Sequence, residues 1–339
     1  MKNLYIFDVS GIVYYGTTGT LSYVYKGMQV SGIKALTGRL TAVLAEHADV
    51  ILAFDARSFR KDLLDVYKGD RVPNRYVGSQ LDLLMEMLEK AGIPCYKFDG
   101  YEADDIISWA VKEFRNSYTN TCIYSNDYDV AHNVQERVYL KPIDNKSNIV
   151  THRNFASAVS RKDDIMFNTI SAHKVFCGCT SDRVPAIKVS GGYTPVSIYR
   201  RFCRFLHENN LTTYEATSDP RIVAIFANTV GLFSDEDKQE VYKRIQIIYP
   251  ANKPEDVQIK PVGLDSIDKE AYSWLLAIGK DYSAAKALGI RALNIPQDVD
   301  QHVKAIYDLV RTGAYSVDRN LEVDPSYEVD SEMMFLKEF

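Results

Sequence analysis

Short apolar runs alternate with longer amphipathic stretches over roughly the first 150 residues of the chain. The strand-like runs lie at residues 4–9, 50–54, 95–98 and 121–124. Apolar side chains recur at helical spacing over residues 33–44, 81–88 and 106–114. Strands that alternate with helices of this length are typical of βαβ units, so we predict an α/β fold with a mainly parallel twisted sheet flanked by helices. In such sheets, ligands bind beyond the carboxyl ends of the strands.

The pattern changes at about residue 163, where strand-like runs fade and helical spacing dominates to about residue 313. We expect helices at residues 165–176, 197–207, 235–249, 268–278 and 299–311. The last stretch has no basic residue between Leu321 and Lys337 and closes on the apolar residues Met333, Met334, Phe335 and Leu336. We therefore predict an α/β domain over residues 1–160, a helical region over residues 161–320 and an acidic tail over residues 321–339.

Composition and charge exclude several classes of protein. Hydrophobic residues make up 46% and charged residues 25% of the 339 residues, as in ordinary globular domains, and no apolar run reaches the roughly 20 residues that a membrane span requires. Residues 1–8 pass directly into a strand-like run, which is not the pattern of a secretory signal. The five cysteines form no paired zinc motif, and we expect a cytoplasmic monomer without membrane association. A net charge of −5 disfavours coating of nucleic acid by bulk attraction but leaves local binding open.

Acidic residues gather where the predicted strands end and where one helix begins. The seven acids are Asp8, Asp55, Glu102, Asp104, Asp105, Asp127 and Asp129. Taken singly, each has an ordinary explanation, because acids favour the first turn of a helix and also stabilise turns. Taken together at one edge of a sheet, they would repel one another unless cations lie between them.

The chemistry of these ligands points to a hard divalent ion. Carboxylate oxygens suit Mg²⁺ or Mn²⁺, not zinc. Two such ions about 4 Å apart activate a water and stabilise the leaving oxygen of a phosphoryl displacement. We therefore predict metal-dependent hydrolysis of phosphodiesters.

Basic residues concentrate directly after Asp55. They are Arg57, Arg60, Lys61, Lys68, Arg71 and Arg75, against three acids in the same stretch. A solvated helix face is the ordinary explanation of such a run, but its place beside the acids favours phosphate binding. A second group surrounds the turn at residues 190–192 and comprises Lys188, Gly191, Gly192, Arg200, Arg201 and Arg204. Backbone amides at a glycine turn between helices can bind a duplex phosphate.

These blocks resemble the bacteriophage and bacterial 5′-nuclease (flap endonuclease) family, which is built on a PIN-like domain. The resemblance covers about residues 3–210. It is carried by the segments at residues 7–8, 54–60, 67–71, 100–105, 127–129 and 181–185, of which Tyr101-Glu102-Ala103-Asp104-Asp105 is the most specific. Within the family, the chain is similar to the phage enzymes that remove RNA primers, often called phage RNase H, and to phage 5′–3′ exonucleases of DNA replication.

The resemblance implies a role for each of these residues. The first metal ion would be surrounded by Asp8, Asp55, Glu102, Asp104 and Asp105, with Asp127 near both ions. Asp129 and Asp182 would serve a second ion, both ions being Mg²⁺ with Mn²⁺ as a substitute. Lys68 and Arg71 would hold the scissile phosphate at the base of a helical arch over residues 72–92. The nucleic-acid contacts would come from the basic groups above and from a helix–turn–helix over residues 164–207.

The chain departs from the family pattern in its second metal site and its glycine turn. Cys179 stands where the family has a carboxylate, and a thiol is a poor ligand for Mg²⁺, so we expect a weakened second site. The family's Gly-Ile-Gly-x-Lys turn is replaced by residues 189–193, and few basic residues follow Arg75 in the arch segment.

The resulting hypothesis is a structure-selective 5′ nuclease acting on 5′ ends, flaps or RNA primers, on branched or 5′-ended duplex DNA and on RNA–DNA hybrids. Two alternatives remain open from the sequence: a PIN-like ribonuclease of single-stranded RNA, and a branched-DNA binding module that has lost catalysis through Cys179. The tail resembles peptides that bind sliding clamps, so a clamp or a single-stranded-DNA-binding protein is a candidate partner. A last helical turn packed on the protein itself is the ordinary alternative.

Overall fold

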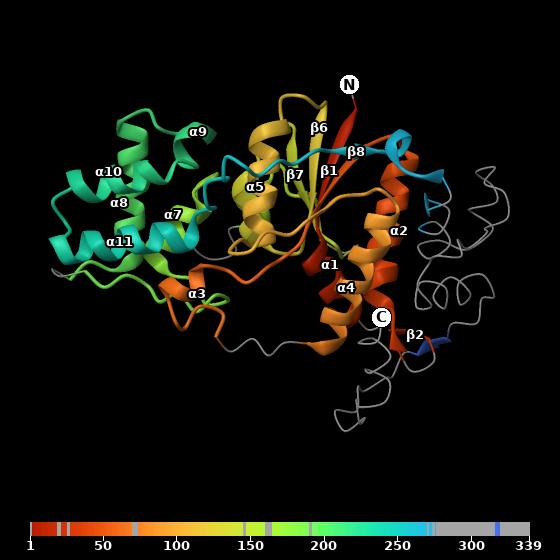
Figure 1. Cartoon of the computed structure of the whole chain (residues 1–339). Helices are drawn as coiled ribbons and strands as arrows, with labels where there is room; N and C mark the ends of the chain where they lie inside the picture. Colours follow the sequence, from red (N-terminus) through yellow and green to blue (C-terminus); the bar gives the residue numbers. More distant parts are fainter. Residues whose placement is uncertain are drawn as a thin grey trace. The chain divides into compact units, whose positions relative to one another are not determined.

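The computed structural model describes residues 2–18, 22–25, 28–69, 74–144, 147–159, 165–189, 192–269, 271, 272, 275 and 316–318 (Figure 1). The chain divides into two compact units. Residues 53–72 and 97–259 form the first unit, and residues 2–52, 73–96 and 260–339 form the second. The fold is a mainly parallel sheet flanked by helices, as the alternating pattern predicts.

The strands of the second unit are buried apolar runs. β1 (Asn3–Asp8), β4 (Asp49–Ala53) and β5 (Cys95–Tyr96) follow the order β5-β4-β1, and β8 (Val262–Gly263) pairs antiparallel with β4. A short 3-10 helix, η2 (Leu264–Ser266), follows β8. The side chains of Leu4, Ile6 and Phe7 have no exposed surface, as expected for strands covered on both faces.

Three helices of the second unit pack on one another. They are α1 (Val9–Thr18), α2 (Ser31–Ala45) and α4 (Arg75–Lys90). The buried amide of Gln80 joins them, because its Oε1 accepts from the Gly32 N–H at 2.8 Å and its Nε2 donates to Thr17 Oγ1 at 3.0 Å. Most of the segment expected to form the arch is therefore a regular helix whose apolar face, including Leu84 and Leu88, is buried within this unit.

A small sheet joins residues far apart in the sequence. β2 (Ser22–Tyr25) pairs antiparallel with β3 (Met28–Gln29) and with β9 (Ser316–Asp318), and Tyr23 lies opposite Val317. The helix expected over residues 299–311 and the acidic tail over residues 321–339 lie outside the described residues. The helix expected over residues 268–278 is described only in part.

The first unit begins with a parallel strand pair and its helices. β6 (Asn120–Tyr124) pairs in parallel with β7 (Val138–Lys141), with Thr121 opposite Val138. The other elements of this part are α3 (Arg60–Leu63), α5 (Ala103–Phe114), the 3-10 helix η1 (Tyr128–Asn133) and α6 (Phe155–Val159).

The remainder of the first unit is helical (Figure 1). Its helices are α7 (Ile170–Cys177), α8 (Pro195–Glu208), α9 (Tyr214–Thr217), α10 (Pro220–Thr229) and α11 (Asp235–Ile248). The rings of Phe176, Phe202 and Phe226 form their core, with centroids 5.3 to 5.8 Å apart. Among the helices that the structure describes, none combines the length and the apolar character needed to cross a bilayer.

The helix expected over residues 165–176 begins later, at Ile170. Asn168 has a left-handed backbone with φ of 59°, which interrupts a helix before that point. The Met166 N–H donates to the Tyr199 hydroxyl oxygen at 2.8 Å, so a tertiary contact replaces a helical hydrogen bond.

Candidate metal centre and nucleic-acid interface

The first turn of α5 presents the acids of the Glu102-Ala103-Asp104-Asp105 segment. Asp55, at the end of β4, meets this turn directly, since its Oδ1 accepts from the Ala103 N–H at 2.8 Å. The sequence expectation that Asp55 and this segment lie together is therefore met by a hydrogen bond. Asp104 is half-buried and lines a pocket.

Asp105 has a different environment from its neighbour Asp104. It has no exposed surface. Its Oδ1 accepts from Arg60 Nη2 at 2.7 Å and from the Ala251 N–H at 2.8 Å. Its Oδ2 accepts from Arg60 Nη1 at 2.8 Å and from the Glu102 N–H at 3.0 Å. Four protein donors thus occupy both oxygens, which corrects the expectation that Asp105 is a metal ligand.

Arg60 is a buried structural residue. Besides Asp105 and Glu102, its guanidinium donates to the backbone carbonyls of Ile247 at 2.7 Å and Tyr249 at 3.2 Å. Only 4% of Arg60 is exposed. Asp105 and Glu102 hold the pKa of Arg60 above its ordinary value, although burial alone would lower it. Nucleic acid cannot reach this side chain, which corrects the expectation that Arg60 binds it.

Glu102 is held mainly by cationic and hydroxyl donors. Its Oε2 accepts from Arg60 Nη1 at 3.2 Å and from the Tyr67 hydroxyl at 2.9 Å, and its Oε1 accepts from Lys68 Nζ at 2.5 Å. Burial and the negative charge of Glu102 raise the pKa of Tyr67 well above its ordinary value, so its hydroxyl stays a donor. With these donors in place, Glu102 is better suited to orient Lys68 than to ligate an ion directly.

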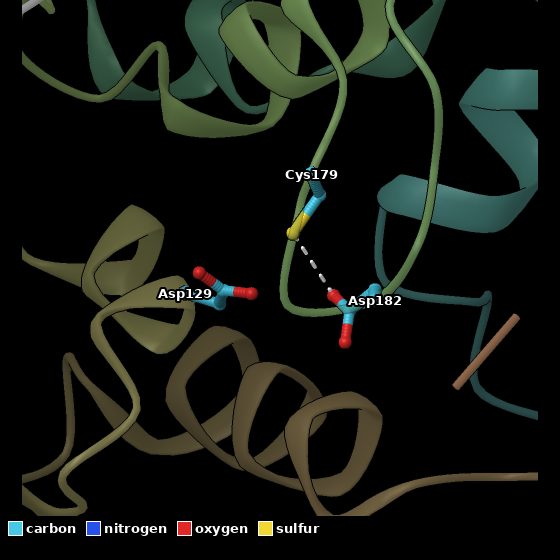
Figure 2. A group of neighbouring side chains, drawn as sticks. All are labelled: Asp129, Cys179 and Asp182. Carbon is cyan, nitrogen blue, oxygen red and sulfur yellow. Dashed lines mark hydrogen bonds between the residues drawn. The ribbon is translucent and has the colours of Figure 1, made fainter. Parts of the chain in front are cut away.

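A second acidic group lies on η1 and on the turn after α7. Asp129, Cys179 and Asp182 place one ligand atom each within 4.8 Å of one another, and Figure 2 shows the three side chains pointing toward one another. The Cys179 thiol donates to Asp182 Oδ2 at 3.3 Å and lies 3.0 Å from Ser181 Oγ. Burial and the nearby carboxylates raise the pKa of the Cys179 thiol.

The turn that carries Cys179 is closed by its own backbone. Cys179 and Val184 exchange two backbone hydrogen bonds of 2.8 and 2.9 Å. Gly178 adopts a φ of 81°, and a Cβ there would come within 2.6 Å of the Val184 carbonyl oxygen, so the position requires glycine.

Lys174, on α7, was missed by sequence reasoning. Its ammonium forms an ion pair with Asp129 and lies 4.0 Å from Asp182 Oδ2. These carboxylates raise the pKa of Lys174 well above its ordinary value, although burial alone would lower it. The available signal was a lysine five residues before Cys179, near the end of the helix predicted over residues 165–176.

Lys68 lies between the two acidic groups, as the sequence predicted for a residue of this site. Its Nζ contacts Glu102 and lies 3.9 Å from Asp182 Oδ1, and its backbone N–H donates to the Asp182 carbonyl at 3.1 Å. Burial alone would lower the pKa of Lys68, but Glu102, Asp104 and Asp182 raise it above its ordinary value.

One pocket of the first unit joins these groups. Its polar lining includes Glu102, Asp104, Asp129, His132, Lys174 and Asp182. Ile170, Ile247, Ile248 and Pro250 supply an apolar wall. The pocket therefore brings carboxylates from three separate segments together with a lysine.

Asp127 precedes η1 and accepts from the Asp129 N–H at 2.8 Å. Protein atoms packed around its carboxyl group, and then the charge of Asp129, raise the pKa of Asp127 to about 6. Because the residue as a whole is exposed, water screens part of this repulsion. The raised pKa therefore comes first from the packing around the carboxyl group and second from the charge of Asp129, while Lys174 opposes it.

Asp8 ends β1 in the second unit. It is buried, and its Oδ1 accepts from the Gly11 N–H at 2.8 Å, in the first turn of α1. A Cβ at position 11 would collide with Asp8 Oδ2, so the carboxylate lies directly over this glycine.

Most of the remaining basic residues predicted to bind nucleic acid are exposed. These are Arg57, Lys61, Lys188, Arg200, Arg201 and Arg204. Arg57 pairs with Asp62 at 3.0 Å, and the Arg201 guanidinium lies 4.9 Å from the ring centroid of Tyr193. Gly192 is exposed with a φ of 79°. Arg71 and Gly191 lie outside the described residues, and only the backbone of Arg75 is described.

The donor set suits one hard divalent ion well and a second one less well. Asp104, Asp127, Asp129 and Asp182 supply carboxylate oxygens, which suit Mg²⁺ or Mn²⁺. At the second position, one of three donors is the Cys179 thiol, and Lys174 already neutralises Asp129. Sulfur is a poor ligand for Mg²⁺.

Comparison with known proteins gives separate information about the reaction. Residues 3–160 match the family described as 5′-3′ exonuclease, N-terminal resolvase-like domain. A 5′-3′ exonuclease of Aquifex aeolicus is 26% identical over 282 residues, which cover 80% of this chain and 91% of the relative. Both similarities point to a nuclease that hydrolyses phosphodiester bonds.

The chain spans less than a quarter of another relative. DNA polymerase I of Borreliella burgdorferi is 30% identical over 213 residues, which cover 60% of this chain but only 23% of the relative. A bacteriophage T5 flap endonuclease, solved in a complex with DNA and metal ions, shares the fold at a TM-score of 0.50 and 14% identity, covering 91% of this chain and 99% of that one.

Proposed function

We propose that this protein is a divalent-metal-dependent phosphodiester hydrolase that acts as a 5′–3′ exonuclease or flap endonuclease. The observation that carries the proposal is the pocket where carboxylates from the start of α5, from η1 and from the Cys179 turn meet Lys174. Crowded carboxylates with lysines beside them suit binding of metal ions and of a phosphate. The match of residues 3–160 to the 5′-3′ exonuclease family supports the same reaction.

A first ion would be held by Asp104 with Asp127 beside it, and a second by Asp129 and Asp182, with Mg²⁺ as the physiological ion and Mn²⁺ as a substitute. When bound, such ions supply an activated water and charge neutralisation for an in-line phosphoryl displacement. Asp8 and Asp55 remain candidate ligands from the ends of β1 and β4. The second position, weakened by Cys179, would be occupied less tightly.

Lys68 and Lys174 would act both on the substrate and on the carboxylates of the metal-free site. Each pairs with a carboxylate of the site, so each offsets the repulsion between the acids. An arriving phosphate would compete for the Lys68 ammonium, which Glu102 keeps directed at the site. Arg71 would add a second cation to the same phosphate. Hydrolysis would leave a 5′-phosphate and a 3′-hydroxyl.

The duplex would bind along the exposed arginines of α8. Arg200, Arg201 and Arg204 project from one helix, and Lys188 and Gly192 lie at the turn before it. Arg57, Lys61 and Arg75 would contact the strand nearer the active site. Tyr193, whose ring packs against Arg201, offers an aromatic surface beside the phosphate contacts. The T5 flap endonuclease was solved with DNA, which favours 5′-ended or branched duplex DNA as the substrate.

The biological setting that we propose is phage DNA replication, with removal of RNA primers from RNA–DNA hybrids as well as 5′ flaps. The acidic tail over residues 321–339 would bind a sliding clamp or a single-stranded-DNA-binding protein. Truncation after Asp330 should preserve nuclease activity and abolish clamp binding. Clamp binding that survives the truncation would contradict this role of the tail.

The decisive experiment uses a duplex with a labelled 5′ flap and an RNA–DNA hybrid, each incubated with Mg²⁺, Mn²⁺ or EDTA. The wild-type chain should cut in either metal and not in EDTA, and Asp104→Ala should abolish cleavage. Glu236→Gln, which changes an exposed acid at the start of α11, is the matched control and should cut normally. Product lengths separate exonuclease from endonuclease action. Binding without cleavage in either metal would instead indicate an inactive branched-DNA binder.

A further inference from the structure

A chain of hydrogen bonds links the two acidic segments of the pocket through a histidine. His132 Nδ1 lies 2.6 Å from the backbone carbonyl oxygen of Asp129, and His132 Nε2 lies 3.0 Å from Ser108 Oγ. Ser108 Oγ in turn lies 2.8 Å from the backbone carbonyl oxygen of Asp104. Asn133 Nδ2 donates to Ser108 Oγ at 3.2 Å from the η1 side.

The chemistry of these partners defines the donors and acceptors. A backbone carbonyl only accepts, so Nδ1 carries a proton and donates it to the Asp129 carbonyl. The Ser108 hydroxyl donates its one proton to the Asp104 carbonyl and accepts from Asn133 Nδ2. His132 Nε2 contacts the same hydroxyl oxygen.

This link joins the first turn of α5 to η1. Among the described residues, no backbone hydrogen bond connects these two segments. Asp104 belongs to the first turn of α5, whereas Asp129 belongs to η1, and both carboxylates line the same pocket. The imidazole holds the main chain of one acid, and Ser108 holds the main chain of the other. Rotation or withdrawal of either turn would break one of the hydrogen bonds made through His132 and Ser108.

We propose that His132 is a positioning residue that sets the spacing between the Asp104 turn and the Asp129 turn, and therefore the spacing of the metal ions that they bind. This inference rests on the proposed function only in that both carboxylates hold metal. The imidazole touches neither substrate nor reacting atoms. Residues that orient metal ligands typically change metal affinity by about 10- to 100-fold when they are replaced.

The test is a Mn²⁺ titration followed by electron paramagnetic resonance, with circular dichroism to confirm folding. In wild type, two Mn²⁺ ions about 4 Å apart should give an exchange-coupled spectrum. His132→Leu removes both hydrogen bonds and should lose the coupled signal while the weaker Mn²⁺ affinity falls about 10-fold. His152→Leu, at an exposed position, is the matched control and should leave the spectrum unchanged.

Two further variants separate positioning from simple loss of packing. His132→Gln can restore the bond to Ser108 and should recover part of the coupled signal, which a purely structural role would not predict. Ser108→Ala removes the hydroxyl between His132 and the Asp104 carbonyl. Its effect on Mn²⁺ affinity should not add to that of His132→Leu.

The outcomes distinguish this proposal from the proposed function. Wild-type coupling in folded His132→Leu would overturn the positioning role. A wild type that binds coupled Mn²⁺ without cutting DNA would overturn only the nuclease. A wild type that binds no Mn²⁺ would overturn both.

Discussion

Arg60 and Asp105 form a buried bidentate ion pair, with Nη1–Oδ2 and Nη2–Oδ1 distances of 2.8 and 2.7 Å. Neither side chain is more than 4% exposed. Through the carbonyls of Ile247 and Tyr249, the same guanidinium binds the end of α11 to the first turn of α5. The geometry of the acidic turn thus depends on a residue far from it in sequence.

We expect Arg60→Met to destabilise the fold strongly, because it leaves the Asp105 carboxylate buried without its cation. Breaking a buried pair in this way costs about 3 to 5 kcal/mol. Denaturant unfolding of the metal-free protein measures the effect. Arg57→Met, which breaks an exposed pair with Asp62, should unfold almost as wild type does. Similar unfolding midpoints for the two variants would contradict the structural assignment of Arg60.

Asp104→Asn should separate activity from stability. It removes a carboxylate from a crowded acidic pocket, so the melting temperature of the metal-free protein should stay the same or rise. Cleavage at saturating substrate should fall at least about 100-fold, since loss of a metal ligand exceeds the effect of an outer partner. Asp105→Asn should lower the melting temperature, because it removes the charge that pairs with the buried Arg60. A drop in melting temperature for Asp104→Asn would argue that its carboxylate is structural.

The presence of Cys179 predicts a gain of function by mutation. Cys179→Asp adds a third carboxylate beside Asp129 and Asp182, which should raise Mg²⁺ affinity at the second position about 10-fold. Repulsion among these three carboxylates should lower the stability of the metal-free variant. Calorimetric Mg²⁺ titration measures the first effect and thermal unfolding the second. Cys179→Ser, which removes sulfur without adding charge, is the control, and equal Mg²⁺ binding by both variants would refute the prediction.

Replacement of the α8 arginines by alanine should weaken substrate binding without changing the chemical step. If Arg200, Arg201 and Arg204 each neutralise one phosphate, each single replacement should reduce the salt dependence of log K by about 0.9. Binding is measured by fluorescence anisotropy from low to high salt, and turnover at saturating substrate should remain that of wild type. Arg221→Ala, on exposed α10, is the control. Unchanged salt dependence in all three α8 variants would place the duplex elsewhere.

The elements of the sheet and helices could be predicted because their signals are local. Buried strands such as β1 and β4 are apolar runs, and α5 and α8 show helical spacing that survives in the structure. Asp55 was predicted correctly to meet the α5 turn, because parallel strands end at a common edge. The late start of α7 was not predictable, since it depends on a contact between Met166 and Tyr199.

The roles within the acidic site were less predictable, because they depend on residues distant in sequence. Asp104 and Asp105 are adjacent in sequence and about 100° apart around the helix, yet Asp104 is half-buried whereas Asp105 is fully buried against Arg60. The hydrogen-bond donors to the Asp105 carboxylate include the Arg60 guanidinium and the Ala251 N–H, which are distant in sequence. Lys174 and His132 belong to no recognisable sequence motif, so only the folded structure reveals their contacts.

The backbone closure of the Cys179 turn has an evolutionary consequence. Backbone hydrogen bonds between Cys179 and Val184, with glycine at 178, close the loop, and the thiol adds contacts to Ser181 and Asp182 that a hydroxyl could also make. A lineage could therefore exchange that side chain among sulfur, hydroxyl and carboxylate groups while the main chain stays in place. A single codon change at position 179 could then alter the ion preference of the second metal position while the fold stays the same.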